Sequence, residues 1–149
     1  MRLLLDTTVL IDYFGQREPF YDDCVKLLVM QAVADAELWS SAKSYTDVFY
    51  VLRKTMDAGK VQDLFLNSFD RIKPCTIDST VLREASLRHW DDFEDCLVAV
   101  CAERLKADYL ITRDVAGFSQ AKTPALSPKD FLAMIERDYG VTYDVIDWP

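Results

Sequence analysis

The sequence predicts an α/β domain in which helices cover both faces of a parallel sheet. Short apolar runs without alternation, such as residues 2–5 and 108–112, are typical of strands buried inside such a sheet. Between these runs, apolar residues recur at the three- and four-residue spacing of amphipathic helices. Strands and helices that alternate along a whole chain are the pattern of α/β folds.

The first part of the chain predicts a strand, two helices and a second strand. The apolar run of residues 2–5 is the first strand, and residues 9–14 have helical spacing that Gly15 ends. Residues 22–34 continue with the same spacing in a longer helix. Residues 37–41 are the second strand.

The middle of the chain predicts two helices and a third strand. Ser41 or Ser44 can cap the first of these helices, and residues 58–69 fit the second. Residues 71–77 are expected to form a strand that contains Pro74. Because proline cannot donate a ladder hydrogen bond, this strand is expected at an edge of the sheet.

The last part of the chain predicts two helices, a strand, a helical turn, a short strand and a final helix. They are expected at residues 78–89, 93–106, 108–112, 115–118, 124–126 and 128–138. Pro128 is well placed at the first position of the final helix. The tail, residues 141–149, predicts no element and could pack on the domain or on a partner.

Composition favours one domain over residues 1–149, in the cytoplasm. Half of the 149 residues are hydrophobic, which is enough for a full core. The start of the chain is too short and too soon acidic for a signal peptide, and no apolar run is long enough for a membrane span. Four cysteines without a CxxC pair and a single histidine do not predict a zinc site, and they suit a reducing compartment.

Three aspartates lie next to apolar segments, either after a predicted strand or at the start of a predicted helix. Asp6 directly follows the first strand, and Asp114 lies just past the fourth. Asp95 lies in the first turn of the helix that leads into that fourth strand. Open α/β sheets bind ligands at the carboxyl ends of their strands, so the three carboxylates are expected to converge there.

Each aspartate taken alone also has a structural explanation. Asp6 and Asp114 could cap the helices that follow them, and Asp95 is one of several acids that a helix dipole would stabilise. Asp47, inside the third helix, could be a solvated surface residue or could lie at the rim of the apolar face. The shared place at one sheet edge makes metal binding the better joint explanation for the first three.

A cluster of carboxylates is costly unless a cation occupies it, because like charges repel. Ligands that are all oxygen suit Mg²⁺ or Mn²⁺. Such an ion can activate water and stabilise the transition state of phosphodiester hydrolysis, and this chemistry needs neither histidine nor cysteine. The sequence therefore favours a metal-dependent hydrolase.

Three segments resemble the PIN domain, and within it the VapC-like toxin ribonucleases and related stand-alone PIN proteins. They are residues 4–10, 92–99 and 107–118, which carry the opening strand with its acid, the acidic helix start and the last acidic turn. The resemblance implies a three-layer α/β/α sandwich with a central, mainly parallel sheet. It also implies endoribonuclease activity that depends on Mg²⁺ or Mn²⁺.

The resemblance assigns the site residue by residue. The first, third and fourth acids of the family match Asp6, Asp95 and Asp114, which would hold the metal. The second acid, usually glutamate, matches Asp47, which would help to position metal or water. Thr112 matches the hydroxyl residue just before the last acidic turn.

Two positions depart from the family pattern. Thr8 stands where asparagine or serine is frequent, and Asp47 is one methylene shorter than glutamate. Asp92 is a further acid on the helix face of Asp95, and it is a reserve candidate. Cations that could contact RNA phosphates are Lys43, Arg53 and Arg113.

The resemblance implies an RNA substrate, an antitoxin partner and a homodimer. A net charge of −8 opposes RNA binding, unless a metal ion or a basic partner offsets it. A PIN-fold binding module with little or no catalysis is the alternative, although the retained acids argue against it. Phosphoryl transfer through an aspartyl intermediate would favour a second aspartate at position 8, which is threonine, and a receiver domain would favour a phospho-acceptor where Pro74 and Cys75 stand.

Overall fold

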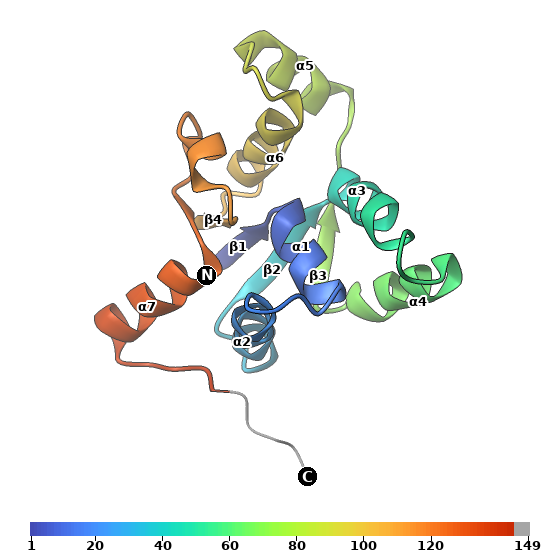
Figure 1. Cartoon of the computed structure of the whole chain (residues 1–149). Coiled ribbons are helices and arrows are strands. Elements are labelled where there is room, and N and C mark those ends of the chain that lie inside the picture. Colours follow the sequence, from blue (N-terminus) through green and yellow to red (C-terminus); the bar gives the residue numbers. More distant parts are fainter. Residues whose placement is uncertain (145–149) are drawn as a thin grey trace.

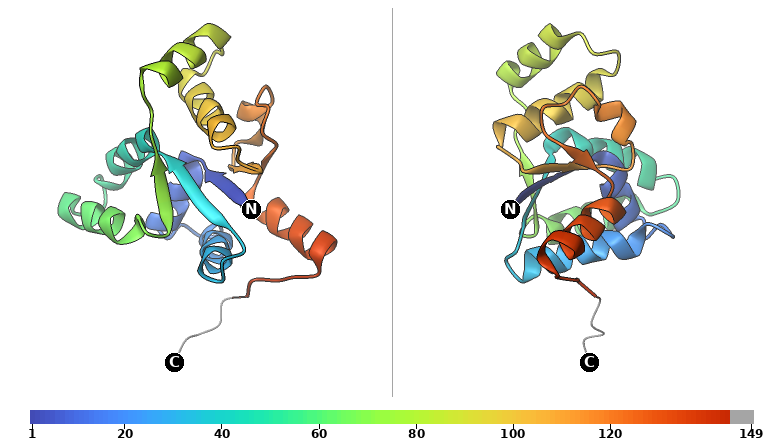
Figure 2. Two further views of the ribbon diagram at one scale, coloured as in Figure 1. Left: turned by 180° about the vertical axis from the view of Figure 1, so that it is seen from behind. Right: turned by 90° about the vertical axis from the view of Figure 1, so that its left-hand side faces the viewer.

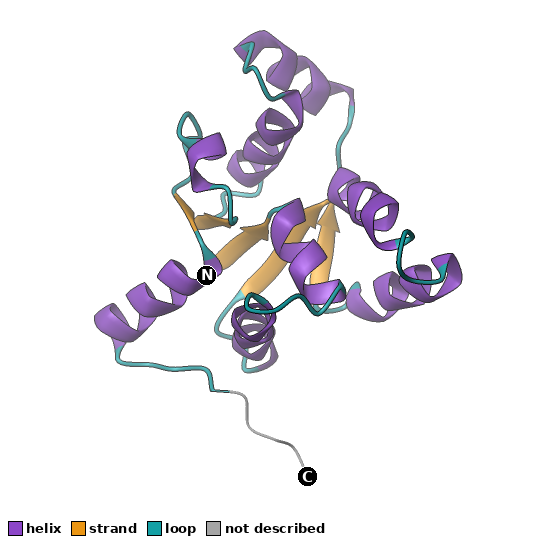
Figure 3. Ribbon diagram, viewed as in Figure 1, coloured by secondary structure: helices purple, strands orange, loops and turns teal. Residues whose placement is uncertain are grey.

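Five parallel strands form one sheet in the computed structural model, which describes residues 1–144 (Figures 1 and 3). The strands are β1 (Arg2–Leu5), β2 (Glu37–Ser41), β3 (Ile72–Cys75), β4 (Tyr109–Ile111) and β5 (Ala125–Leu126). Their order across the sheet is β3-β2-β1-β4-β5, and each neighbouring pair is parallel. The predicted α/β class with a parallel sheet is confirmed.

Helices cover both faces of this sheet, which gives three layers (Figures 1 and 2). The helices are α1 (Thr7–Phe14), α2 (Tyr21–Ala32), α3 (Ala42–Leu52), α4 (Ala58–Ser68), α5 (Ser79–Arg88), α6 (Phe93–Arg104), the 3₁₀ helix η1 (Val115–Phe118) and α7 (Pro128–Tyr139). Successive residues of β1 point to opposite faces. Leu3 and Leu5 join the core of α1 to α4 and α7, whereas Leu4 joins the core of α5, α6 and η1.

The strand order reverses between β1 and β4, and this reversal positions the site. From β1 the chain moves outward through β2 to β3, and it then returns to the other side of β1 as β4. The helices on the outward path cover one face, and α5 and α6 on the return path cover the other. Such a reversal opens a crevice at the carboxyl ends of the two strands, where ligands bind in α/β sheets.

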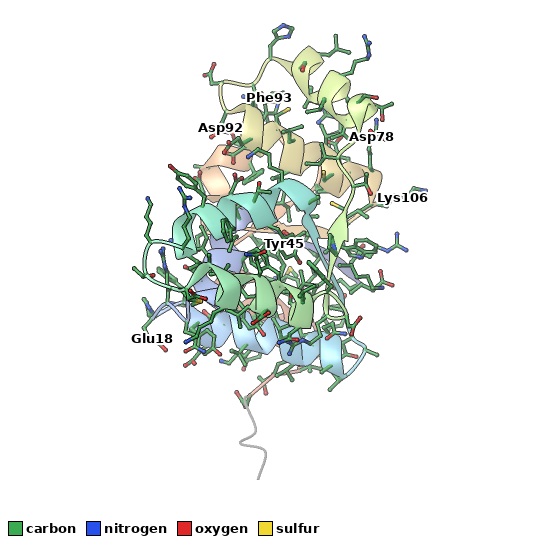
Figure 4. All side chains as sticks on the ribbon, turned by 90° about the vertical axis from the view of Figure 1, so that its right-hand side faces the viewer. Glu18, Tyr45, Asp78, Asp92, Phe93 and Lys106 are labelled. Carbon is green, nitrogen blue, oxygen red and sulfur yellow. The ribbon has the colours of Figure 1, made fainter. Side chains whose placement is uncertain are left out.

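The middle of helix α6 is buried on all sides. Every residue from Cys96 to Ala102 is buried, because the helix lies between the sheet and α5. A helix that is apolar all round is typical of such a central place. Figure 4 labels Asp92 and Phe93 at its start. The packing of α6 therefore fixes the place of the acids in its first turn.

Individual element predictions are confirmed with shifts of a few residues. Pro74 lies in β3 opposite Ser40, at the edge of the sheet as expected. Helix α1 begins at Thr7, earlier than predicted, because Asp6 has the extended backbone of an N-cap residue. His89 ends α5 in the left-handed conformation, so it is a helix-capping residue.

The first residues of the tail pack on the domain. The hydroxyl of Tyr143 donates a hydrogen bond of 2.7 Å to Asp35, and its ring contacts the larger core. The rest of the tail, residues 145–149, lies outside the residues that the structure describes. Along residues 1–144, no helix is both long and apolar enough to span a membrane.

Candidate active site

A pocket of about 150 Å³ opens at the carboxyl ends of β1 and β4. Its lining includes all four acids that the sequence singled out: Asp6, Asp47, Asp95 and Asp114. The remaining lining residues are Thr7, Thr8, Ser41, Lys43, Ser44, Glu94, Leu97 and Val98. Residues far apart in the sequence therefore meet where the topology predicts a ligand site.

Asp6 is buried, with 5% of its surface exposed. It occupies the N-cap position of α1, yet its side chain makes no capping hydrogen bond. Instead, its Oδ2 accepts hydrogen bonds from the hydroxyls of Thr112 (2.9 Å) and Thr8 (3.2 Å). Burial raises the pKa of Asp6, although the Thr112 hydroxyl acts in the opposite direction. Capping alone thus does not explain this carboxylate.

The Thr112 hydroxyl connects two of the acids. It donates to Asp6 and accepts a hydrogen bond of 3.0 Å from the backbone N–H of Asp114. Thr8 connects Asp6 with the residue before Asp114: its hydroxyl donates to Asp6 and accepts from the backbone N–H of Arg113 at 3.2 Å. The two threonines therefore hold the carboxylate of Asp6 against the loop that carries Asp114.

Replacing Thr112 by valine should weaken Mn²⁺ binding by about 10- to 100-fold, the usual cost of losing a group that orients a metal ligand. Valine keeps the volume of the fully buried threonine and removes only the hydroxyl bonds. Isothermal titration with Mn²⁺ measures the effect. T112S keeps the hydroxyl and should bind Mn²⁺ like the wild type; equal affinity in T112V would show that the hydroxyl does not orient Asp6.

Asp95 lies in the first turn of α6, and Asp92 is the N-cap residue of this helix. The Oδ1 atom of Asp92 accepts a hydrogen bond of 3.0 Å from the backbone N–H of Asp95. Asp92 does not line the pocket, so this reserve candidate is a capping residue. Burial raises the pKa of Asp95 to about 7, and repulsion from Asp92, Asp6 and Asp114 adds to the shift. The carboxylates thus lie close enough to oppose one another's ionisation.

Asp114 both caps η1 and faces the pocket. Its Oδ1 accepts a hydrogen bond of 3.2 Å from the N–H of Gly117. A Cβ atom at position 117 would lie 2.6 Å from Oδ2 of Asp114 and 2.8 Å from Oδ2 of Asp95. Gly117 therefore leaves the space in which these two carboxylates approach each other. Sequence reasoning missed this residue; its only sequence signal is a glycine three residues after a predicted acid.

Asp47 lies at the rim of the pocket and is paired with a cation. Lys43, one helical turn earlier on α3, donates to both oxygens of Asp47 at 2.8 and 2.9 Å. Its Nζ also donates to Glu94 of α6 at 3.1 Å. Burial by itself would lower the pKa of Lys43, but the hydrogen bonds to Asp47 and Glu94 together have the larger effect and raise this pKa. Neither pair was predicted from the sequence; the i,i+4 spacing of Lys43 and Asp47 is a signal that could have indicated the first, whereas no local pattern indicates the contact with Glu94.

A cluster of hydroxyls connects α1 with the start of α3. Thr7 donates a hydrogen bond of 2.9 Å to Ser44, whose oxygen lies 2.9 Å from that of Ser41. Ser41 is the N-cap of α3 and accepts from the N–H of Ser44. These hydroxyls were not predicted as part of the pocket, and they make its wall polar without adding charge.

The other two cations proposed for RNA phosphates are engaged elsewhere. The guanidinium of Arg113 forms an ion pair with Asp12, whose side chain is only 1% exposed, and lies 4.2 Å from the centre of the Phe20 ring. The guanidinium of Arg53 lies 4.4 Å from the centre of the Tyr50 ring. Neither residue lines the pocket, and their contact with RNA phosphates stays a prediction.

Asp6, Asp95 and Asp114 suit a divalent cation by their chemistry. They offer only oxygen, they oppose one another's charge, and within residues 1–144 none of the ion pairs includes them. In this same part of the chain, no group of three His, Cys, Asp or Glu side chains is already arranged as a metal site. The three carboxylates therefore share a pocket without forming a closed ligand shell.

Mn²⁺ affinity should rise as the pH increases through about 7, because Asp95 must lose its proton to bind a cation. Without metal, the pKa of Asp95 is about 7 in the folded chain and about 3.9 in the unfolded chain. This difference stabilises the fold fully below about pH 3.9, and the stabilisation is lost as the pH rises to about 7. D95N should therefore melt at an increasingly higher temperature than the wild type between pH 5 and pH 8 in EDTA. A pH-independent difference would contradict this effect.

Comparisons with known proteins agree with this geometry. A family model described as PIN domain matches residues 2–116, which contain all four acids. No curated protein matches the sequence. The fold is similar to a chain of VapBC-1 from nontypeable Haemophilus influenzae, with a TM-score of 0.63 and 16% identity over 87% of this chain and 99% of that one.

Two further solved structures are similar in fold. VapBC2 from Rickettsia felis, bound to a DNA fragment from its promoter, has a TM-score of 0.63 and 16% identity over 85% of this chain and 98% of that one. A toxin–antitoxin complex from Klebsiella pneumoniae gives a TM-score of 0.63 and 16% identity, over 85% of this chain and 97% of that one. At this identity the likeness concerns the fold.

Proposed function

Because the chain belongs to the PIN domain family, whose members are generally nucleases, we propose that it is a metal-dependent endoribonuclease. The observation that carries the proposal is the meeting of Asp6, Asp95 and Asp114 in one pocket at the switch point of the sheet. The whole chain, residues 1–149, would act as one domain. Four free cysteines, all buried, suit the reducing cytoplasm as its compartment.

The three carboxylates would hold Mg²⁺ or Mn²⁺, which when bound would supply an activated water and positive charge for phosphodiester hydrolysis. Thr8 and Thr112 orient Asp6 by their hydrogen bonds. Asp47, assigned to the site by family resemblance, lies at the rim, where Lys43 fixes its carboxylate. Threonine hydroxyls thus position the carboxylate of Asp6, and a lysine ammonium group positions that of Asp47.

The direct test is cleavage of an end-labelled single-stranded RNA in Mg²⁺, in Mn²⁺ and in EDTA, with DNA of the same sequence as a control. We expect internal cuts in the RNA with either metal and none in EDTA. Cleavage that persists in EDTA would contradict the metal dependence. Cleavage of DNA alone would contradict the RNA substrate.

Thermal unfolding separates catalysis from binding. A ligand that binds only the native state stabilises it by about 2.7 kcal/mol at 100 times its Kd. We therefore expect millimolar Mn²⁺ to raise the melting temperature at pH 8. An unchanged melting temperature together with no RNA cleavage would favour the alternative, a PIN-fold module that binds RNA or protein without catalysis.

We also propose an antitoxin partner and a homodimer. The proposal of a partner is supported by the likeness to chains of toxin–antitoxin assemblies and by the net charge of −8, which a basic partner would complement. Co-expression with the product of any small reading frame that adjoins the gene tests it. The partner should copurify and suppress RNA cleavage, whereas a neighbour that does neither would argue for a stand-alone nuclease. Analytical ultracentrifugation of the chain by itself tests the dimer.

A further inference from the structure

Lys43 connects two helices at the mouth of the pocket. Its Nζ lies 2.8 and 2.9 Å from the two oxygens of Asp47 on α3, and 3.1 Å from Oε1 of Glu94 on α6. An ammonium group has three donors, and these three acceptors use all of them. Both oxygens of Asp47 are thus engaged by one cation that belongs to the chain.

The acids of the pocket fall into two groups. Its lining includes five carboxylates but, among the described residues, Lys43 as the one lysine or arginine. Lys43 forms ion pairs with both acids of the outer group, Asp47 and Glu94, and offsets one of their two negative charges. The inner group has no such partner within residues 1–144; it consists of Asp6, Asp95 and Asp114. One side of the pocket therefore carries its own cation, and the other does not.

We propose that Lys43 is a built-in cation for the outer acids, so that this pocket takes one divalent ion instead of two. The inference rests on the proposed function. In sites with two ions, the ions lie about 3.5–4 Å apart and share the charge of all the carboxylates. A second ion at Asp47 would have to displace Nζ from both of its oxygens and then repel the released ammonium group. Lys43 is in this sense a positioning residue, which holds Asp47 away from metal.

The test counts bound ions by the loss of the free Mn²⁺ signal in electron paramagnetic resonance, at pH 8. The wild type should bind one Mn²⁺ per chain. K43M keeps an unbranched side chain of nearly the same length but frees Asp47 and Glu94, so it should bind two. K43R keeps the charge and should bind one, as should K60M, which removes an exposed lysine of α4.

The outcomes separate the two proposals. A wild type that binds two ions, or a K43M variant that binds only one, would overturn the role of Lys43 while leaving the metal-dependent nuclease in place. A wild type that binds no Mn²⁺ would overturn the proposed function itself, and the inference with it. Circular dichroism and melting temperature show whether K43M is folded, and K43Q provides a second neutral variant if it is not.

Discussion

G117A should cleave RNA about 100-fold more slowly than the wild type while keeping its fold. The added Cβ would lie 2.6 Å from Asp114 Oδ2 and 2.8 Å from Asp95 Oδ2, so both carboxylates must move. They are the ends of mobile side chains, which makes the cost to stability small. Displacing groups at a reacting centre by about 1 Å can cost about 100-fold in rate. Single-turnover cleavage and thermal unfolding measure the two effects.

G59A is the matched control for this experiment. Gly59 lies in α4, where an added Cβ would meet only the side chain of Asp57, at 3.1 Å. Its cleavage rate should equal that of the wild type, and its stability should rise by up to about 1 kcal/mol, because alanine is the better helix former. If G117A cleaved RNA as fast as G59A, the approach of Asp95 to Asp114 would not be part of the active site.

D6N should lose at least about 100-fold of the metal-dependent cleavage, since even a group that only supports a ligand is worth about 10- to 100-fold. The amide oxygen can still accept from Thr8 and Thr112, so the fold should persist. Without metal, the variant should be at least as stable as the wild type, because a buried charge is removed. Cleavage assays and melting curves with and without Mn²⁺ measure both.

D63N is the control for D6N, because it neutralises an exposed aspartate of α4 away from the pocket. This control should keep both cleavage and the rise in melting temperature with Mn²⁺. Full activity in D6N would refute the assignment of Asp6. A loss of cleavage with an unchanged Mn²⁺ response would mean that Asp6 serves the chemistry without binding the ion.

The sequence was sufficient for the sheet because local patterns specify it. Unbroken apolar runs identify strands that are buried on both faces, and Pro74 identifies the edge. The place of Asp6 and Asp114 follows from the same patterns, since Asp6 directly follows β1 and Asp114 lies three residues past the end of the neighbouring strand β4. Only the structure, however, distinguishes these two aspartates from ordinary helix caps. Asp6 makes no capping bond, whereas Asp114 caps η1 and also faces the pocket.

The unpredicted parts of the site depend on contacts between elements far apart in the chain. Lys43 meets Glu94 only because α3 and α6 border the same pocket. Arg113 forms an ion pair with the buried carboxylate of Asp12, which comes from a helix at the other end of the sequence, and no sequence pattern predicted that pair. The need for a residue without a Cβ at position 117 arises only because Asp95 lies beside Asp114 in the folded chain. Neither spacing nor composition encodes such side-chain pairings.

The most direct test of the central claim is anomalous diffraction from crystals soaked in Mn²⁺ at pH 8, where Asp95 is ionised. We expect an anomalous peak bound by carboxylate oxygens of Asp6, Asp95 and Asp114, with Lys43 still hydrogen-bonded to Asp47. A crystal with Mn²⁺ bound only elsewhere, or with no peak in the pocket at saturating Mn²⁺, would contradict it.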